Sequence, residues 1–172
     1  PAEIPPKRNW LNEYCLRYSA LNGFKYSPPS KHPFNPLAAL RMSLKKVSGD
    51  DQLRVIDSIF KGGWSHGADL GDLSTLISLL TKESIDGESL SHKISDIDIK
   101  ELLINETNYA IEKGVFGVPT IIIDDNLFWG NDQMDHIELL LDGKDPLDRE
   151  RLNDQERPRA IDRKAFKKQD KE

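Results

Sequence analysis

Apolar residues recur at spacings of three and four through the middle of the chain, and this period predicts a series of helices. One helix is expected to begin after Asn35 and Pro36, because asparagine caps helices and proline suits their first position. Leu37, Leu40 and Leu44 fall on one face of this predicted helix. A second helix is predicted over about residues 50–61.

Two further helices have clear end signals. Gly62 and Gly63 are expected to stop the second helix, and Asp72 to cap the third. The fourth and longest should begin at Ser95 or Asp96 and end at Gly114, since glycine adopts the left-handed conformation that closes helices. These helices together form an all-helical block over residues 36–113, which is the second of four segments into which the chain divides.

The regions before and after this helical block have different patterns. Residues 1–35 are rich in proline and predict an extended connector with one short helix over residues 9–21. Residues 114–144 predict a β-hairpin over 120–129, followed by a short helix that Gly130, Asn131 and Asp132 open. Residues 145–172 are charged and hold few large apolar side chains, so we expect a poorly ordered or surface-bound tail.

Composition excludes several classes of function. The 29 acidic and 24 basic residues give a net charge of -5, opposite in sign to the usual nucleic-acid-binding surface. No apolar run reaches the roughly 20 residues of a membrane span. The single cysteine, Cys15, permits neither an internal disulfide nor a thiolate metal site, and we expect it to be a buried, inert thiol. No histidine has metal-ligand spacing, so we expect no metal. The lack of a membrane-length apolar run predicts a soluble protein, and the lack of a possible disulfide favours a reducing, cytoplasmic compartment.

Two short segments carry candidate binding chemistry. A cis bond between Val118 and Pro119 would turn the Val118 backbone groups outward to pair with a peptide-like ligand, although trans is the commoner form of any X-Pro bond. From Trp129 to Asp132, free amides attract a carboxylate and the Asp132 side chain suits an ammonium. The alternative for this second segment is an ordinary helix cap.

Read together, these segments resemble the C-terminal half of a thioredoxin-like domain. The run from Gly114 to Thr120, the three isoleucines that follow, and the segment Phe128 to Gln133 are most similar to the 2-hydroxychromene-2-carboxylate isomerases and kappa-class glutathione transferases, which have a DsbA-like thioredoxin fold. In that family a helical block interrupts the thioredoxin fold, as residues 36–113 do here. The resemblance covers roughly residues 1–147.

The resemblance implies an α/β, thioredoxin-like fold with an all-helical insertion and a C-terminal hairpin plus helix. It also implies an N-terminal strand–helix–strand unit that we expect to be missing from this chain. That unit carries the family's catalytic serine, so no catalytic residue is assigned here. Binding residues are implied as follows: the Val118 backbone beside cis Pro119 for the cysteinyl part of glutathione; Trp129, Gly130, Asn131 and Asp132 for its γ-glutamyl end; and Phe34 and Asn35 for an aromatic substrate.

The implied function is that of a glutathione-dependent isomerase in the degradation of aromatic compounds, acting as a homodimer. The glutathione thiolate would add reversibly to an unsaturated, ring-opened aromatic pyruvate, allow rotation, and leave. Three alternatives stay open: a kappa-type glutathione transferase, a Dsb-type disulfide oxidoreductase, which needs a CxxC pair, and a non-catalytic truncated protein that binds a partner through its exposed sheet edge.

Overall fold

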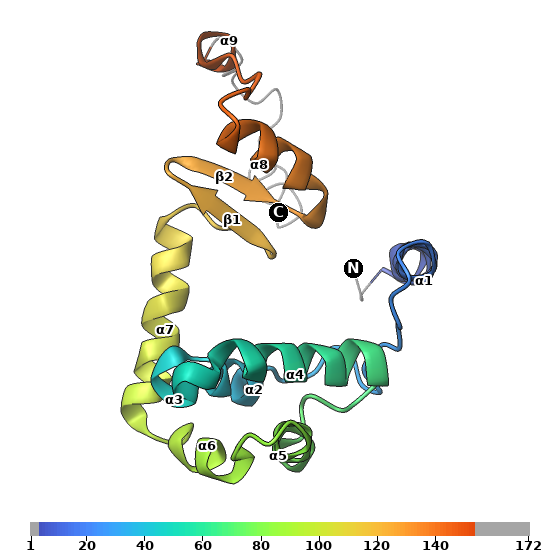
Figure 1. The fold of residues 1–172 in the computed structure, drawn as a ribbon, viewed down its shortest axis with the longest axis vertical. Coiled ribbons are helices and arrows are strands. Elements are labelled where there is room, and N and C mark those ends of the chain that lie inside the picture. The colour runs from blue at the N-terminus through green and yellow to red at the C-terminus, as the bar shows by residue number, and fades with distance from the viewer. Residues whose placement is uncertain (1–3, 154–172) are drawn as a thin grey trace, which may run out of the picture. The chain divides into compact units, whose positions relative to one another are not determined.

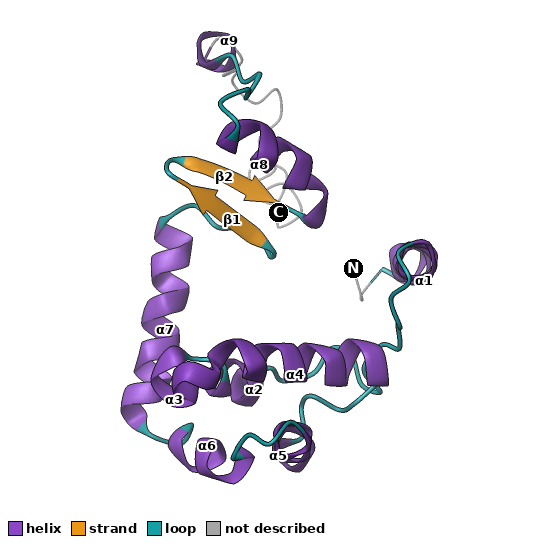
Figure 2. Cartoon of the chain, viewed as in Figure 1, coloured by secondary structure: helices purple, strands orange, loops and turns teal. Residues whose placement is uncertain are grey.

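The computed structural model describes residues 4–153, which divide into two compact units between Lys113 and Gly114. The first unit is built from helices, and the second from a hairpin followed by helices (Figures 1 and 2). We call them the helical unit and the hairpin unit. The change of sequence period at Gly114 therefore coincides with the change of architecture.

The helical unit contains helices of very different length. In chain order they are α1 (Pro5–Leu21), α2 (Leu37–Met42), α3 (Lys45–Ser48), the 3-10 turn η1 (Gly49–Asp51), α4 (Gln52–His66), α5 (Leu73–Lys82), α6 (Gly87–Lys93) and α7 (Ile97–Glu112).

Several predicted helix ends are confirmed. The Asp72 side chain accepts the Thr75 N–H at 2.9 Å and caps α5, and Asp96 is the N-cap of α7. The side chain of Asn35 accepts the Leu37 N–H at 3.1 Å at the start of α2. Gly114 follows α7 with φ 87°, a conformation that glycine adopts without the steric cost of a Cβ.

Other predicted helix limits are wrong. Helix α1 begins at Pro5 rather than at residue 9, because both prolines lie at the first two helical positions, where no N–H is needed. Gly62 and Gly63 lie inside α4, which continues to His66 and ends at Gly67. A Cβ on either glycine would collide with Leu79 or Leu70, so these glycines allow neighbouring side chains to pack against the helix backbone. Helix α6 was not predicted at all.

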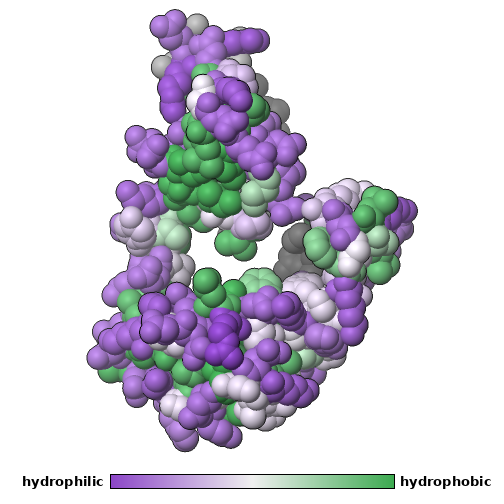
Figure 3. All heavy atoms as spheres, viewed as in Figure 1, coloured by the Kyte–Doolittle hydropathy of each residue, from purple (hydrophilic) through white to green (hydrophobic). Residues whose placement is uncertain are grey.

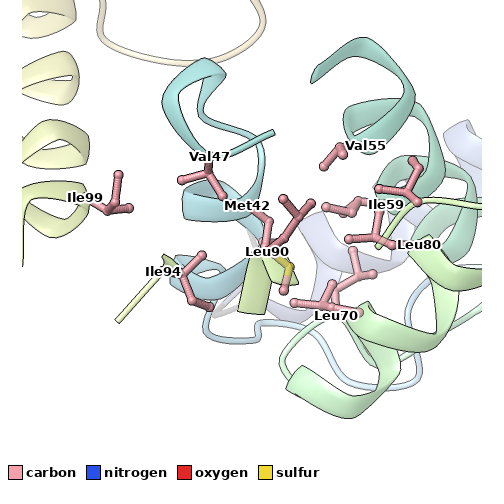
Figure 4. Packing of buried hydrophobic residues seen from close by; sticks show 12 residues of the cluster. Met42, Val47, Val55, Ile59, Leu70, Leu80, Leu90, Ile94 and Ile99 are labelled. Atoms are coloured by element: carbon pink, nitrogen blue, oxygen red, sulfur yellow. The ribbon is translucent and has the colours of Figure 1, made fainter. Parts of the chain in front are cut away.

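The core of the helical unit is formed by side chains from α2 to α7 and from the loops between them (Figure 4). Its fully buried large side chains are Met42, Val55, Leu76 and Leu80. Leu37 and Leu40, expected on an apolar face, are exposed, while Ala39 and Met42 on the same helix are buried. Periodicity identified a helix here, but two of the three leucines on the predicted face are exposed, and the third, Leu44, follows the helix and packs against the core.

The hairpin unit contains β1 (Thr120–Ile123) and β2 (Asn126–Trp129), which pair antiparallel with Ile121 opposite Phe128. A 3-10 turn, η2 (Asn131–Gln133), leads into α8 (Met134–Leu141), and α9 (Arg149–Asn153) follows. Among the described residues of this unit, Ile137 is the single buried apolar side chain. Apolar side chains consequently gather on its surface (Figure 3).

The structure also bears on the expectations for the C-terminal tail, for Cys15 and for membrane spans. The predicted disordered tail includes α9, and its remainder after Asn153 lies outside the described residues. Cys15 is half-buried rather than buried, because Trp10, Leu11 and Tyr14 around it on α1 are exposed. Among the helices described, none combines the length and apolarity that crossing a bilayer requires.

Candidate functional site

The Val118–Pro119 bond is cis. Local chemistry alone favoured trans, whereas the family resemblance implied cis, and the resemblance is confirmed on this point. Pro119 immediately precedes β1, so the bond lies at the entrance to the hairpin. His32–Pro33 is also cis, in the segment that leads to α2.

The two candidate binding segments of the hairpin unit lie side by side. The Gly130 N–H donates to the Pro119 carbonyl at 3.0 Å, and Thr120 is paired with Trp129 across the sheet. The Thr120 hydroxyl donates to the Gly117 carbonyl at 2.6 Å, which fixes the turn before the strand. The pairing of the two strands therefore brings the segments together.

Trp129 forms an aromatic wall over the turn before β1. Its ring centroid lies 5.2 Å from that of Phe116. A Cβ on Gly117 would lie 2.5 Å from the indole Nε1, a separation that Cβ atoms do not tolerate, so the close approach of Trp129 requires glycine at this position. Both aromatic rings are exposed and present apolar surface to a ligand.

Val118 offers unused backbone groups. The residue is 86% exposed, and within the described part of the chain neither its N–H nor its carbonyl makes a hydrogen bond. Exposed backbone groups at the end of a strand are the ones that an extended peptide-like ligand pairs with. The geometry therefore suits the role that the sequence suggested for this residue.

The segment after β2 differs from prediction in one respect. The α-helix begins at Met134, and Asn131, Asp132 and Gln133 form a 3-10 turn before it. The Asp132 carboxylate is exposed and accepts a long hydrogen bond of 3.4 Å from Gln133 Nε2. In the described residues no lysine, arginine or histidine forms an ion pair with it, so this carboxylate is available to an ammonium group.

The two residues suggested for the aromatic substrate lie in the helical unit. Asn35 is engaged as the cap of α2. Phe34 is half-buried and lines an apolar pocket of about 150 Å³ together with Phe60 and Trp64. The sequence pattern did not predict this pocket, although Phe60 and Trp64 lie four residues apart on α4.

A larger groove of about 560 Å³ lies between α4 and α5, but its polar side chains are largely bonded to neighbours. Lys61 pairs with Asp57 at 2.7 Å, and the Ser58 hydroxyl donates to the Leu79 carbonyl. His66 Nδ1 lies 3.1 Å from the Lys61 carbonyl. This groove therefore offers a ligand few polar side chains that are not already hydrogen-bonded within the protein.

Comparison with known proteins gives one family and several relatives. A family model described as a DSBA-like thioredoxin domain matches residues 1–142. A 2-hydroxychromene-2-carboxylate isomerase of Pseudomonas putida is 34% identical over 85 residues, which are 48% of this chain and 41% of the relative. The enzyme of the same name from Sphingobium xenophagum is 28% identical over 141 residues, 81% of this chain and 70% of the relative.

The fold also matches a solved structure. A 2-hydroxychromene-2-carboxylate isomerase superposes with a TM-score of 0.71 at 24% sequence identity, covering 81% of this chain and 68% of that one. At this identity the likeness establishes the thioredoxin-like fold. The matched part of this chain spans 41% of the Pseudomonas putida relative and 42% of a relative of the same name from Pseudomonas sp. strain C18, less than half of either length.

Proposed function

The chain belongs to the DSBA-like thioredoxin domain family, and from this premise we propose that it acts as a glutathione-dependent 2-hydroxychromene-2-carboxylate isomerase. The observation that carries the proposal is the bond from the Gly130 N–H to the Pro119 carbonyl, which places the unpaired backbone of Val118 beside the segment that leads to Asp132. Relatives named for this isomerase activity support the choice of reaction.

The donor and acceptor set of the hairpin unit fits glutathione. Val118 presents one N–H and one carbonyl, the pair needed by the cysteinyl part of a tripeptide. Asp132 presents a carboxylate for the γ-glutamyl ammonium, and charge-assisted hydrogen bonds of this kind are among the stronger polar contacts. Trp129 and Gly130 lie between these two groups. The Trp129 ring gives the ligand an apolar wall, and Gly130, which has no side chain, lets the ligand approach the protein backbone. Asn131 completes the proposed set.

When bound, glutathione would supply a thiolate that adds reversibly to the substrate double bond, permits rotation about it, and leaves unchanged. The residues of this chain bind and orient the tripeptide. We assign stabilisation of the thiolate to a serine on the strand–helix–strand unit of the whole protein, and none of the described residues takes that role. Assembly as a cytoplasmic homodimer stays a prediction.

The proposal is tested by an isomerase assay on the protein extended N-terminally through its upstream coding sequence. We expect 2-hydroxychromene-2-carboxylate to be converted to its ring-opened isomer, followed by absorbance, only when reduced glutathione is present. S-methylglutathione is the matched control, because it keeps both ends of the ligand and lacks the thiolate. Conversion that does not depend on glutathione, or no conversion by a folded protein, would contradict the proposal.

A further inference from the structure

We propose that Thr120 is a positioning residue: its hydroxyl fixes the direction of the Val118 N–H and thereby determines how tightly the hairpin unit binds glutathione. Thr120 itself need not touch the ligand. The direction of the N–H can be measured with no ligand present, whereas the effect on glutathione affinity rests on the proposed function. The two parts of the inference can therefore fail separately.

The peptide unit between Gly117 and Val118 is the part of the turn that Thr120 holds. Its carbonyl belongs to Gly117 and its N–H belongs to Val118. The cis bonds in the described residues are His32–Pro33 and Val118–Pro119, so this peptide is trans. In a planar trans peptide the C=O and the N–H point in opposite directions. A contact that draws the Gly117 carbonyl towards the protein consequently turns the Val118 N–H away from it.

The Thr120 hydroxyl supplies this contact. It donates to the Gly117 carbonyl at 2.6 Å, at the short end of the usual range for O–H···O bonds, and the bond is partly buried. Val118, in contrast, is 86% exposed, and its N–H makes no hydrogen bond within the described part of the chain. One end of the peptide unit is thus held by the protein, and the other end faces solvent.

The sheet holds Thr120 itself in place. Its backbone lies opposite Trp129 in the antiparallel ladder, and the preceding carbonyl, of Pro119, accepts the Gly130 N–H at 3.0 Å. Threonine is branched at Cβ, so its side chain has few rotamers to choose from. The hydroxyl is therefore already in position before a ligand arrives, and binding does not have to order this side chain.

The Trp129 indole also restricts this peptide unit. A Cβ on Gly117 would lie 2.5 Å from Nε1, so the ring lies directly against the Cα of this glycine. Phe116 packs against the same ring, with a centroid separation of 5.2 Å. Rotation of the peptide would move atoms that are next to the ring. The hydroxyl and the indole together keep the Val118 N–H aimed outward.

The alternative is that Thr120 is present because threonine is favoured in strands. Valine has almost the same shape and also suits a strand, but its side chain has no hydrogen-bond donor. Thr120→Val therefore removes the hydroxyl and keeps the strand residue, whereas Thr120→Ser keeps the hydroxyl. Thr107 donates to the Leu103 carbonyl at 2.7 Å in α7, so Thr107→Val is the matched control for loss of a threonine hydroxyl.

The first part of the test is calorimetric titration of the N-terminally extended protein with glutathione, with circular dichroism to establish that each variant is folded. We expect Thr120→Val to bind about two- to tenfold more weakly, the range that corresponds to one ordinary hydrogen bond. Thr120→Ser should restore most of the affinity, and Thr107→Val should leave it unchanged. A role in strand formation predicts the opposite order for the two Thr120 variants, because valine is enriched in strands and serine is not.

The second part measures the direction of the Val118 N–H on the same proteins without glutathione. A soluble paramagnetic probe should relax the Val118 amide proton strongly in the unmodified protein and in Thr120→Ser. The relaxation should be weaker in Thr120→Val, where the peptide is free to turn inward.

Two results would overturn the inference: equal relaxation in all three proteins, or glutathione affinity that Thr120→Val retains. A third result separates the inference from the proposed function. If the relaxation differs as expected but the folded, unmodified protein does not bind glutathione, the proposed function is wrong, and Thr120 remains the residue that aims the Val118 N–H.

Discussion

Asp132 is the side chain on which the assignment of the γ-glutamyl end depends. It is the one member of the proposed glutathione set with a formal charge, and no cationic side chain in the described residues pairs with it. We predict that Asp132→Ala weakens glutathione binding by about 1 to 3 kcal/mol, the range for hydrogen bonds to charged groups. Calorimetric titration measures the change.

The matched control is Asp135→Ala. Asp135 is also exposed and lies in the first turn of α8, so its removal changes the net charge and the helix terminus in the same way. Glutathione affinity should be almost unchanged in this variant. Equal losses in the two variants would indicate a general electrostatic effect, and no loss in Asp132→Ala would remove Asp132 from the site.

For individual residues, the sequence predicted which chemical groups a site could use, but not which neighbours those groups contact. The suitability of the Asp132 carboxylate for an ammonium follows from local chemistry, whereas the cis bond that turns the Val118 backbone outward was implied by the family resemblance. The hairpin places the two segments side by side. The contact of the Trp129 indole with Gly117 could not be predicted, because it depends on the register of the hairpin. The pocket beside Phe60 and Trp64 could not be predicted either, because spacing on a helix does not reveal what packs next to it.

Helix α5 begins with a capping arrangement that predicts a pH dependence. Hydrogen bonds from the side chains of Ser74 and Thr75 and from the Thr75 N–H lower the pKa of Asp72 from 3.8 to about 2. Because the pKa is lower in the folded state, the charged cap stabilises the fold above about pH 4. That contribution is lost as the pH falls towards 2.

We therefore predict that Asp72→Asn reduces the acid sensitivity of the helical unit. Asparagine can still accept the capping hydrogen bond but does not titrate. Thermal unfolding followed by circular dichroism, between about pH 5 and pH 2, should show a smaller fall in Tm for this variant than for the unmodified chain. Equal falls in Tm would mean that Asp72 does not contribute to the acid transition.

The success of sequence reasoning about elements depended on whether the signal was local. The helix starts at Asp72 and Asp96 depend on signals within one turn, and the structure confirms both as N-cap residues, Asp72 with a capping side-chain hydrogen bond. Gly62 and Gly63 were misread because their role is to admit Leu79 and Leu70 from α5 and the loop before it. Tertiary packing of this kind overrides the low helix propensity of glycine, which costs roughly 1 kcal/mol relative to alanine.

For the whole molecule, the change of period at Gly114 predicted where the architecture changes, and the family resemblance supplied the thioredoxin-like fold. The resemblance was needed because an isolated hairpin is marginally stable and does not by itself specify a fold. The apolar surface of the hairpin unit, with Ile137 as its single buried apolar side chain among the described residues, is consistent with a larger sheet in the whole protein. The extra strands stay a prediction.

The central claim is that the hairpin unit carries the glutathione surface. The most direct measurement is a backbone amide NMR titration of reduced glutathione into this chain and into the N-terminally extended protein. We predict that shifts cluster on Val118, on the Trp129 indole and on residues 130–132, with tighter binding in the extended protein. If both proteins are folded and these resonances do not move, or if the shifts cluster elsewhere, the claim is wrong.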